Sequence, residues 1–147
     1  MADAVTVTYL YPPNMLDGGW DEKQGNKRVI VQMTCLSDAS GETDVVKVNL
    51  SDLKTPNGNV PGKTAVEWIE YQISGMTVLL EWDRAPHAEI ARMDAATSQN
   101  SGRIDWGQFG GKVDPGDDDR TGDILLTSTN VTLADSYNIT MCIRLKD

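Results

Sequence analysis

The stretch Tyr137-Asn-Ile-Thr-Met-Cys-Ile-Arg-Leu145 decides the fold, because apolar and polar residues alternate along it. Side chains of an extended chain point to opposite faces in turn. One face therefore carries Tyr137, Ile139, Met141, Ile143 and Leu145. The other face carries Asn138, Thr140, Cys142 and Arg144. This pattern predicts a β-strand that buries its first face and exposes its second to water.

Similar runs recur along the chain, and helical periodicity is almost absent. Six of them are Val5–Tyr11, Arg28–Leu36, Asp44–Leu50, Ala65–Ile73, Met76–Trp82 and Asp123–Thr129. Shorter runs lie at Glu89–Met93 and Ile104–Trp106, whereas residues 85–96 (APHAEIARMDAA) fit either a short helix or a strand. Clusters of Gly, Asn and Pro separate the runs, among them residues 56–59, 98–102 and 110–111, and predict turns.

Seven to nine short strands with frequent turns predict an all-β fold, an antiparallel β-sandwich or jelly-roll-like domain. The length of 147 residues corresponds to a single domain, 1–147. Residues 1–13 form an extended N-terminal segment that fits either an arm or an ordinary first strand. The two prolines that follow, Pro12 and Pro13, would block further ladder pairing.

Composition restricts the classes of partner. The net charge of −9 repels phosphate backbones, so we expect no nucleic-acid partner. No run reaches the roughly 18–20 apolar residues of a membrane span, and the N-terminus lacks the pattern of a secretory signal, so we expect a protein of the cytosol with no membrane contact. In that compartment Cys35 and Cys142, both inside predicted strands, are expected to be free, half-buried thiols.

The aspartate-rich stretch 114–123 (DPGDDDRTGD) has two interpretations. Asp117, Asp119, Thr121 and Asp123 have the spacing of oxygen ligands in a calcium loop. Against this, Ser128 occupies the position where such a loop needs a bidentate carboxylate, and no helix flanks the stretch. The favoured interpretation is a solvated turn, made by Pro115-Gly116, that leads into a strand and binds no metal.

No residue pattern indicates catalysis. His87 is the only histidine, and it follows Pro86 in a polar stretch with no nucleophile motif nearby, so a surface histidine is favoured over a catalytic one. With 22 acidic residues, a pair of carboxylates close enough for glycoside hydrolysis is expected by chance. The sequence therefore predicts neither an enzyme nor a cofactor.

The tryptophans allow a second kind of binding. Trp82 alternates in phase with Met76, Val78 and Leu80, which predicts a core position. Trp20 and Trp106 are expected to be exposed. Exposed tryptophans on a β-sandwich can stack on sugars, so a carbohydrate-binding module is one alternative; tryptophans that merely pack loops are the other.

The second half of the chain resembles a known group. Its order of turn and strand motifs is Gly75–Asp83, Ser101–Trp106, Phe109-Gly-Gly111, Thr121–Thr127 and Asp135–Thr140. This order is similar to that of small virion-associated proteins of tailed bacteriophages, over about residues 75–145. The Asn14–Asp21 loop and the aspartates at 117–119 are particular to this chain, and the resemblance supplies no site residues.

The resemblance implies a non-enzymatic structural protein, assembled in the host cytoplasm and located on the virion. The favoured role is a capsid decoration or cement protein that binds the major capsid protein on the outer head surface and stabilises the shell. A symmetric homo-oligomer, with a trimer favoured, is expected with it, and a head–tail or tail component is the alternative within this class. The residues expected to contact the partner are Val5, Val7, Tyr9, Tyr11, Pro12, Pro13, Trp20, Trp106 and Phe109.

Overall fold

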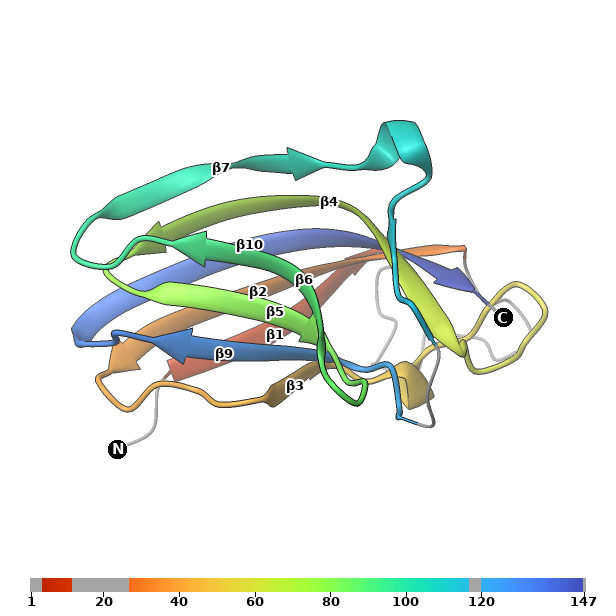
Figure 1. Cartoon of the computed structure of the whole chain (residues 1–147), viewed down its shortest axis with the longest axis horizontal. Helices are drawn as coiled ribbons and strands as arrows, with labels where there is room; N and C mark the ends of the chain where they lie inside the picture. The colour runs from red at the N-terminus through yellow and green to blue at the C-terminus, as the bar shows by residue number, and fades with distance from the viewer. Residues whose placement is uncertain (1–3, 12–26, 117–119, 147) are drawn as a thin grey trace.

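The structure, a computed structural model, describes residues 4–11, 27–116 and 120–146 (Figure 1). The strands in these ranges are β1 (Ala4–Tyr11), β2 (Arg28–Asp38), β3 (Val45–Val48), β4 (Lys63–Ser74), β5 (Thr77–Trp82), β6 (Ala88–Asp94), β7 (Gln99–Asp105), β8 (Lys112–Val113), β9 (Ile124–Thr129) and β10 (Leu133–Lys146). Two short 3-10 helices, η1 (Leu50–Asp52) and η2 (Gly107–Phe109), join them. No helix in the described ranges is long and apolar enough to cross a membrane.

Two antiparallel sheets form a β-sandwich, as the sequence predicts. The larger sheet has the order β1-β2-β10-β4-β7, with β8 also paired to β4, and the smaller sheet has the order β3-β9-β5-β6. The ladders β2–β10, β3–β9, β4–β7 and β5–β6 are nested, each enclosed by the one before along the chain. This nesting is the connectivity of a jelly roll, and β1 is added at one edge of the larger sheet.

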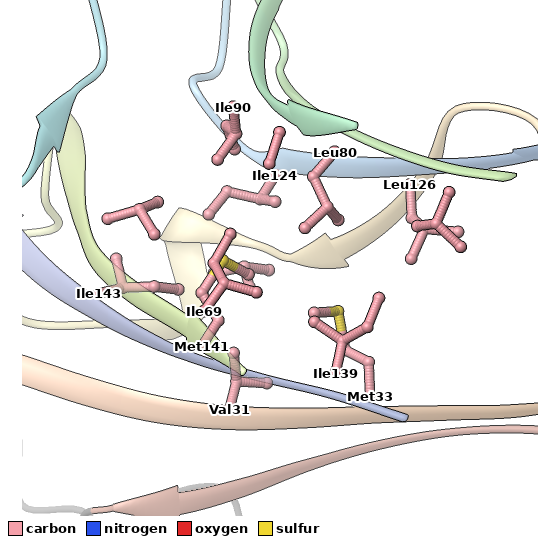
Figure 2. Packing of buried hydrophobic residues seen from close by; sticks show 14 of the residues in the cluster. Val31, Met33, Ile69, Leu80, Ile90, Ile124, Leu126, Ile139, Met141 and Ile143 are labelled. Atoms are coloured by element: carbon pink, nitrogen blue, oxygen red, sulfur yellow. The ribbon is translucent and has the colours of Figure 1, made fainter. Parts of the chain in front are cut away.

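The core lies between the sheets and is centred on β10. All five side chains predicted to share the buried face of β10 are at most 5% exposed. Figure 2 shows Ile139, Met141 and Ile143 pointing toward Leu80 and Ile124 of the opposite sheet. Trp82, predicted to be a core residue, is 1% exposed. Full burial of each such side chain stabilises the fold by about 1.5–3 kcal/mol, so this layer holds the two sheets together.

Several predicted elements differ in the structure. Residues 85–96 form a loop and then strand β6, which resolves the choice between helix and strand. The predicted strand Asp44–Leu50 is wrong at its end, because the Asn49 side chain accepts a hydrogen bond from the Ser51 N–H and starts η1. The predicted turn at 98–102 is wrong from Gln99 onward, because these residues pair with β4 as part of β7. The N-terminal segment, as far as it is described, is an ordinary first strand.

Both cysteines are buried thiols, whereas the sequence predicts half-buried ones. Cys35 joins the core, whereas Cys142 lies on the opposite face of the larger sheet beside Ile30 and Trp68. The prediction that Cys142 faces water is therefore wrong. Its neighbours on that face are large enough to cover a small side chain, which leaves it only 5% exposed.

A buried ion pair lies at the β3 edge of the sandwich. A register shift between Val46 and Val48 accompanies the inward placement of Lys47, whose side chain is 2% exposed. Its ammonium group contacts the Glu42 carboxylate, and the Tyr137 hydroxyl donates to the same carboxylate at 2.6 Å. These two donors compensate the cost of burying the charge of Glu42.

Candidate functional site

The free edge of β1 is the strongest candidate for contact with a partner. β1 pairs with β2 on one side, and within the described residues no strand pairs with its other side. Its eight residues, AVTVTYLY, carry no charge. An edge of this kind presents unpaired N–H and C=O groups with no charged residue to block another strand. It therefore has the properties of a surface that adds a strand from a partner.

Apolar side chains along β1 remain partly exposed. Val5 and Val7 point to the inner side of the larger sheet, yet they are 36% and 38% exposed. The reason is geometric: β1 lies at the edge of the larger sheet, and the smaller sheet, with only four strands, does not extend far enough to cover it. Leu10 and Tyr11 are each 48% exposed, and Leu36 beside Ala4 is 57% exposed. Val5 and Val7 lie on the inner face of the sheet, and Tyr11 and Leu36 lie on the outer face. We call Val5, Val7, Leu10, Tyr11 and Leu36, which flank the strand on both faces, the β1 edge patch.

Tyr9 has a different role from its neighbours on β1. Its ring is packed against the core, and burial, with the nearby carboxylates of Asp52 and Asp123, raises the pKa of its hydroxyl well above the usual range. Tyr9 therefore anchors β1 to the body of the sandwich. Pro12, Pro13 and Trp20, which the sequence placed in the same contact, lie outside the described residues.

The predicted contact residues Trp106 and Phe109 lie at the opposite edge of the larger sheet, beyond the end of β7 (Figure 1). Four ladder steps separate β1 from β7, which is about 19 Å at the usual strand spacing. Phe109, in η2, is 82% exposed. Trp106, predicted to be exposed, is partly buried, because its ring packs against the core and Lys112 Nζ lies 5.5 Å from the ring centroid. The predicted contact residues that the structure describes therefore do not form one surface.

The outer face of the larger sheet is polar and carries two open grooves. The first has a volume of about 480 Å³, and its lining includes Gln72, Gln99, Asn100 and Asn138. The second has about 380 Å³ and adjoins it through Gln72, Ser101 and Asn138. At the β7 side, the Arg103 guanidinium lies 4.6 Å from the centroid of the Trp68 ring and pairs with Glu70. This face offers many hydrogen-bonding groups and one covered aromatic ring.

The described part of the aspartate-rich stretch is held by structural contacts. Asp114 is fully buried and forms an ion pair with Arg84. The Asp123 carboxylate accepts a hydrogen bond from the Leu50 N–H at 2.9 Å, and the Thr121 hydroxyl donates to Asp83 at 2.7 Å. These contacts give Thr121 and Asp123 roles in joining the loop to the sandwich. Asp117 and Asp119, the other predicted calcium ligands, lie outside the described residues.

His87 lies in a cluster of carboxylates that sequence reasoning missed. Its side chain is 33% exposed, as expected for a surface histidine. Nδ1 lies 3.5 Å from Glu81 Oε1 and 3.7 Å from Asp44 Oδ1, and Nε2 lies 3.9 Å from Asp83 Oδ1. The signal available in the sequence was the spacing of Glu81, Asp83 and His87. Asp44 could not be found that way, because only the pairing of β3 and β5 with β9 brings it near.

Comparison with models of known protein families finds no match for this chain. No curated protein matches it either. The assignment of function therefore depends on the surfaces described above.

Proposed function

We propose that this chain is a non-enzymatic structural protein of a tailed-phage virion, and that it decorates the outer surface of the head. In this proposal it binds the major capsid protein, stabilises the shell and is assembled in the host cytoplasm. The observation that carries the proposal is the uncharged edge of β1, which no described strand covers, with the exposed side chains of the β1 edge patch.

The β1 edge stands out against the rest of the molecule. The chain carries a net charge of −9, and the other long edges have charged side chains, such as Arg103 and Asp105 on β7 and Glu89 and Arg92 on β6. Charged edges resist strand addition, whereas an uncharged one permits it. A partner that supplies a strand and apolar contacts would fit β1 best, which supports binding to another protein.

The body of the protein suits a role in which many copies bind one shell. Nested ladders and a continuous core hold the edge strands in fixed positions. A fixed surface loses little conformational freedom on binding, and a shell with many equivalent sites makes even a weak contact effective when copies are linked in an oligomer. These properties support a decoration role. A head–tail or tail component would use the same edge at fewer sites.

The experiment adds purified protein to heads assembled without it and counts bound copies by electron microscopy and quantitative mass spectrometry. The proposal expects saturable binding at symmetry-related positions. Val7→Lys, which puts a charge on the β1 edge, is expected to weaken binding at least tenfold. Val60→Lys is the matched control, because Val60 is 51% exposed and lies outside β1. Absence of binding at every salt concentration, or equal loss in both variants, would contradict the proposal. Binding confined to one vertex would favour the head–tail alternative.

The proposal includes a homotrimer in solution. Light scattering after size-exclusion chromatography should give three times the chain mass of 16.1 kDa. A monomer at the concentrations that saturate heads would contradict the trimer. The contact with the shell would then be tested by the binding experiment alone.

The grooves on the larger sheet favour a second candidate function, carbohydrate binding. Their lining of amide and hydroxyl groups can exchange hydrogen bonds with sugar hydroxyls. Trp68 would contribute stacking if Arg103 moved aside. This candidate expects selective binding on a glycan array that is lost in Asn138→Ala and Trp68→Ala and retained in Val7→Lys. An array on which no glycan binds would contradict carbohydrate binding. Binding that is lost in Val7→Lys and retained in Asn138→Ala and Trp68→Ala would favour the β1 edge as the binding surface.

A further inference from the structure

We propose that His87, Asp44 and Glu81 form a binding site for a divalent transition-metal cation, with Zn²⁺ as the best fit. One atom from each side chain lies within 4.8 Å of the other two. The residues come from three places on the smaller sheet: the position just before β3, the end of β5 and the loop between β5 and β6. This site is independent of the β1 edge and of the grooves.

The distances favour a metal over direct hydrogen bonds. His87 Nδ1 lies 3.5 Å from Glu81 Oε1 and 3.7 Å from Asp44 Oδ1, and both separations exceed the usual 2.7–3.2 Å of an N–H···O bond. Zinc bound tetrahedrally at 2.0–2.1 Å holds its ligand atoms about 3.3–3.5 Å apart. A cation placed between the three groups therefore needs only small side-chain movements.

The charge at the site also favours a cation. Asp44, Glu81 and Asp83 surround one imidazole, and in the described ranges the ion pairs of these three carboxylates all involve His87. The Glu81 side chain is only 17% exposed, so water screens its charge incompletely. A divalent cation would balance carboxylates that no lysine or arginine of the described chain balances. Carboxylate oxygen and imidazole nitrogen are both ligands that zinc accepts.

The remaining contacts orient the ligands. Asp83 Oδ1 lies 3.9 Å from His87 Nε2, on the side of the imidazole away from Nδ1, so metal binding at Nδ1 leaves Nε2 facing this carboxylate. Asp83 is held in turn by the Thr121 hydroxyl at 2.7 Å. The Asp44 carboxylate accepts a hydrogen bond from the Thr127 hydroxyl at 3.2 Å. A carboxylate behind a histidine ligand is the usual support of a zinc site, and Asp83 would take this positioning role once it came within hydrogen-bond distance of Nε2.

Bound metal would cross-link the smaller sheet. Asp44 immediately precedes edge strand β3, and Glu81 lies on β5, with β9 between the two strands. The three protein ligands leave a fourth position for water or for a side chain of a partner. The expected consequence is a folded state that melts at higher temperature in the presence of zinc.

The test uses the untagged full chain, freed of metal with a chelator, and titrates it with Zn²⁺ by calorimetry. We expect one site per chain and a higher Tm on zinc addition. His87→Ala and Glu81→Gln should each weaken binding at least tenfold and abolish the Tm rise. Glu70→Gln is the matched control, because it removes the same charge from β4 of the larger sheet, away from the cluster, and should change affinity less than twofold.

Three results would overturn the proposal. One is the absence of saturable zinc uptake, which would mean that the three side chains do not form a metal site. Another is equal affinity in wild type and His87→Ala, which would indicate an adventitious ion only. The third is a strong sulfur-to-metal absorption band when Co²⁺ replaces Zn²⁺, which would place the ion on a cysteine. Apo-state melting curves of each variant check that a lost site does not reflect a lost fold.

Discussion

Arg84 and Asp114 form a buried bidentate ion pair that links the β5–β6 loop to the aspartate-rich stretch. Nε and Nη2 of Arg84 donate to the two carboxylate oxygens of Asp114 at 2.8 and 2.6 Å. The Asp114 side chain is completely buried, and that of Arg84 is 4% exposed. Arg84 also donates to the carbonyl oxygen of Arg120 at 3.0 Å. A stretch that in sequence resembles a solvated acidic turn thus begins with a structural carboxylate.

Removing one partner of this pair should destabilise the fold strongly. Arg84→Met leaves the Asp114 carboxylate buried without a cation, and such a change costs about 3–5 kcal/mol. Urea unfolding followed by tryptophan fluorescence measures the loss. The double variant Arg84→Met/Asp114→Leu should recover part of it, because it removes both charges. A loss below 1 kcal/mol in the single variant would mean that water replaces the guanidinium.

A glycine beside the ion pair should tolerate no side chain. Gly122 has φ +75°, and a Cβ atom there would lie 2.8 Å from Arg84 Nη2 and 3.1 Å from Asp114 Oδ2. Gly110 has a similar φ of +81°, but no atom lies within 4 Å of its Cβ position. We expect Gly110→Ala to cost about 1–2 kcal/mol, the strain of the left-handed backbone alone. Gly122→Ala should cost about 2 kcal/mol more, since it also displaces the pair, and equal losses in chemical denaturation would contradict this.

The Tyr137 hydroxyl should contribute to stability through Glu42. Tyr137→Phe removes a donor at 2.6 Å from a buried carboxylate, which should cost about 1–3 kcal/mol. Tyr11→Phe is the matched control, because Tyr11 is 48% exposed, and its free energy of unfolding should change by less than about 0.5 kcal/mol. Lys47→Met should cost about 3–5 kcal/mol, because it leaves Glu42 with an unpaired charge. Equal stability of the two Tyr→Phe variants would show that the hydroxyl contributes nothing.

The Cys142 thiol should be unreactive in the folded protein. Burial, reinforced by the Glu67 carboxylate, raises the pKa of Cys142 from 9.0 to about 11. At pH 8 this shift lowers the thiolate fraction roughly 100-fold, so alkylation by iodoacetamide should be slower by at least that factor than in urea. Peptide mass spectrometry separates Cys142 from Cys35. Rapid alkylation of native Cys142 would show that its cover opens readily.

The same pKa shift predicts weaker folding at alkaline pH. Between about pH 9 and 11 the unfolded thiol loses its proton while the folded one keeps it, so the free energy of unfolding falls as pH rises through this window. Tyr9 has a raised pKa too and adds to the decline at higher pH. Comparison of wild type with Cys142→Ala isolates the thiol. An identical pH dependence of the two proteins between pH 9 and 11 would contradict the assignment.

Alternation of side chains predicted most of the strands, because it directly reflects burial on one face of a sheet. The five inward residues of β10 illustrate this. The pattern failed where local chemistry competed with it. Asn49 ends a strand because its side chain caps η1. The polar residues after Ser98 form a strand because their backbone pairs with β4.

The candidate site was less predictable, because its parts come from distant segments. The residues expected to contact a partner were chosen as apolar or aromatic, yet exposure depends on what lies opposite in the other sheet. Val5 and Val7 are exposed because the four-stranded sheet does not extend over β1. The Trp106 ring is partly covered by the side chain of Lys112. The proximity of Asp44 to His87 likewise follows from strand order, which no local pattern contains.

The position of β10 bears on how the protein is made. β10 pairs with both β2 and β4, yet all the other strands that the structure describes precede it in the chain. During translation, β2 and β4 therefore lack their shared pairing partner until β10 has emerged from the ribosome. Folding therefore depends on contacts between residues about a hundred positions apart, as between Gln32 and Asn138, and such folds form slowly. In this interval the nascent chain is most exposed to aggregation, so chaperones and temperature should influence the yield more than the stability of the finished fold does.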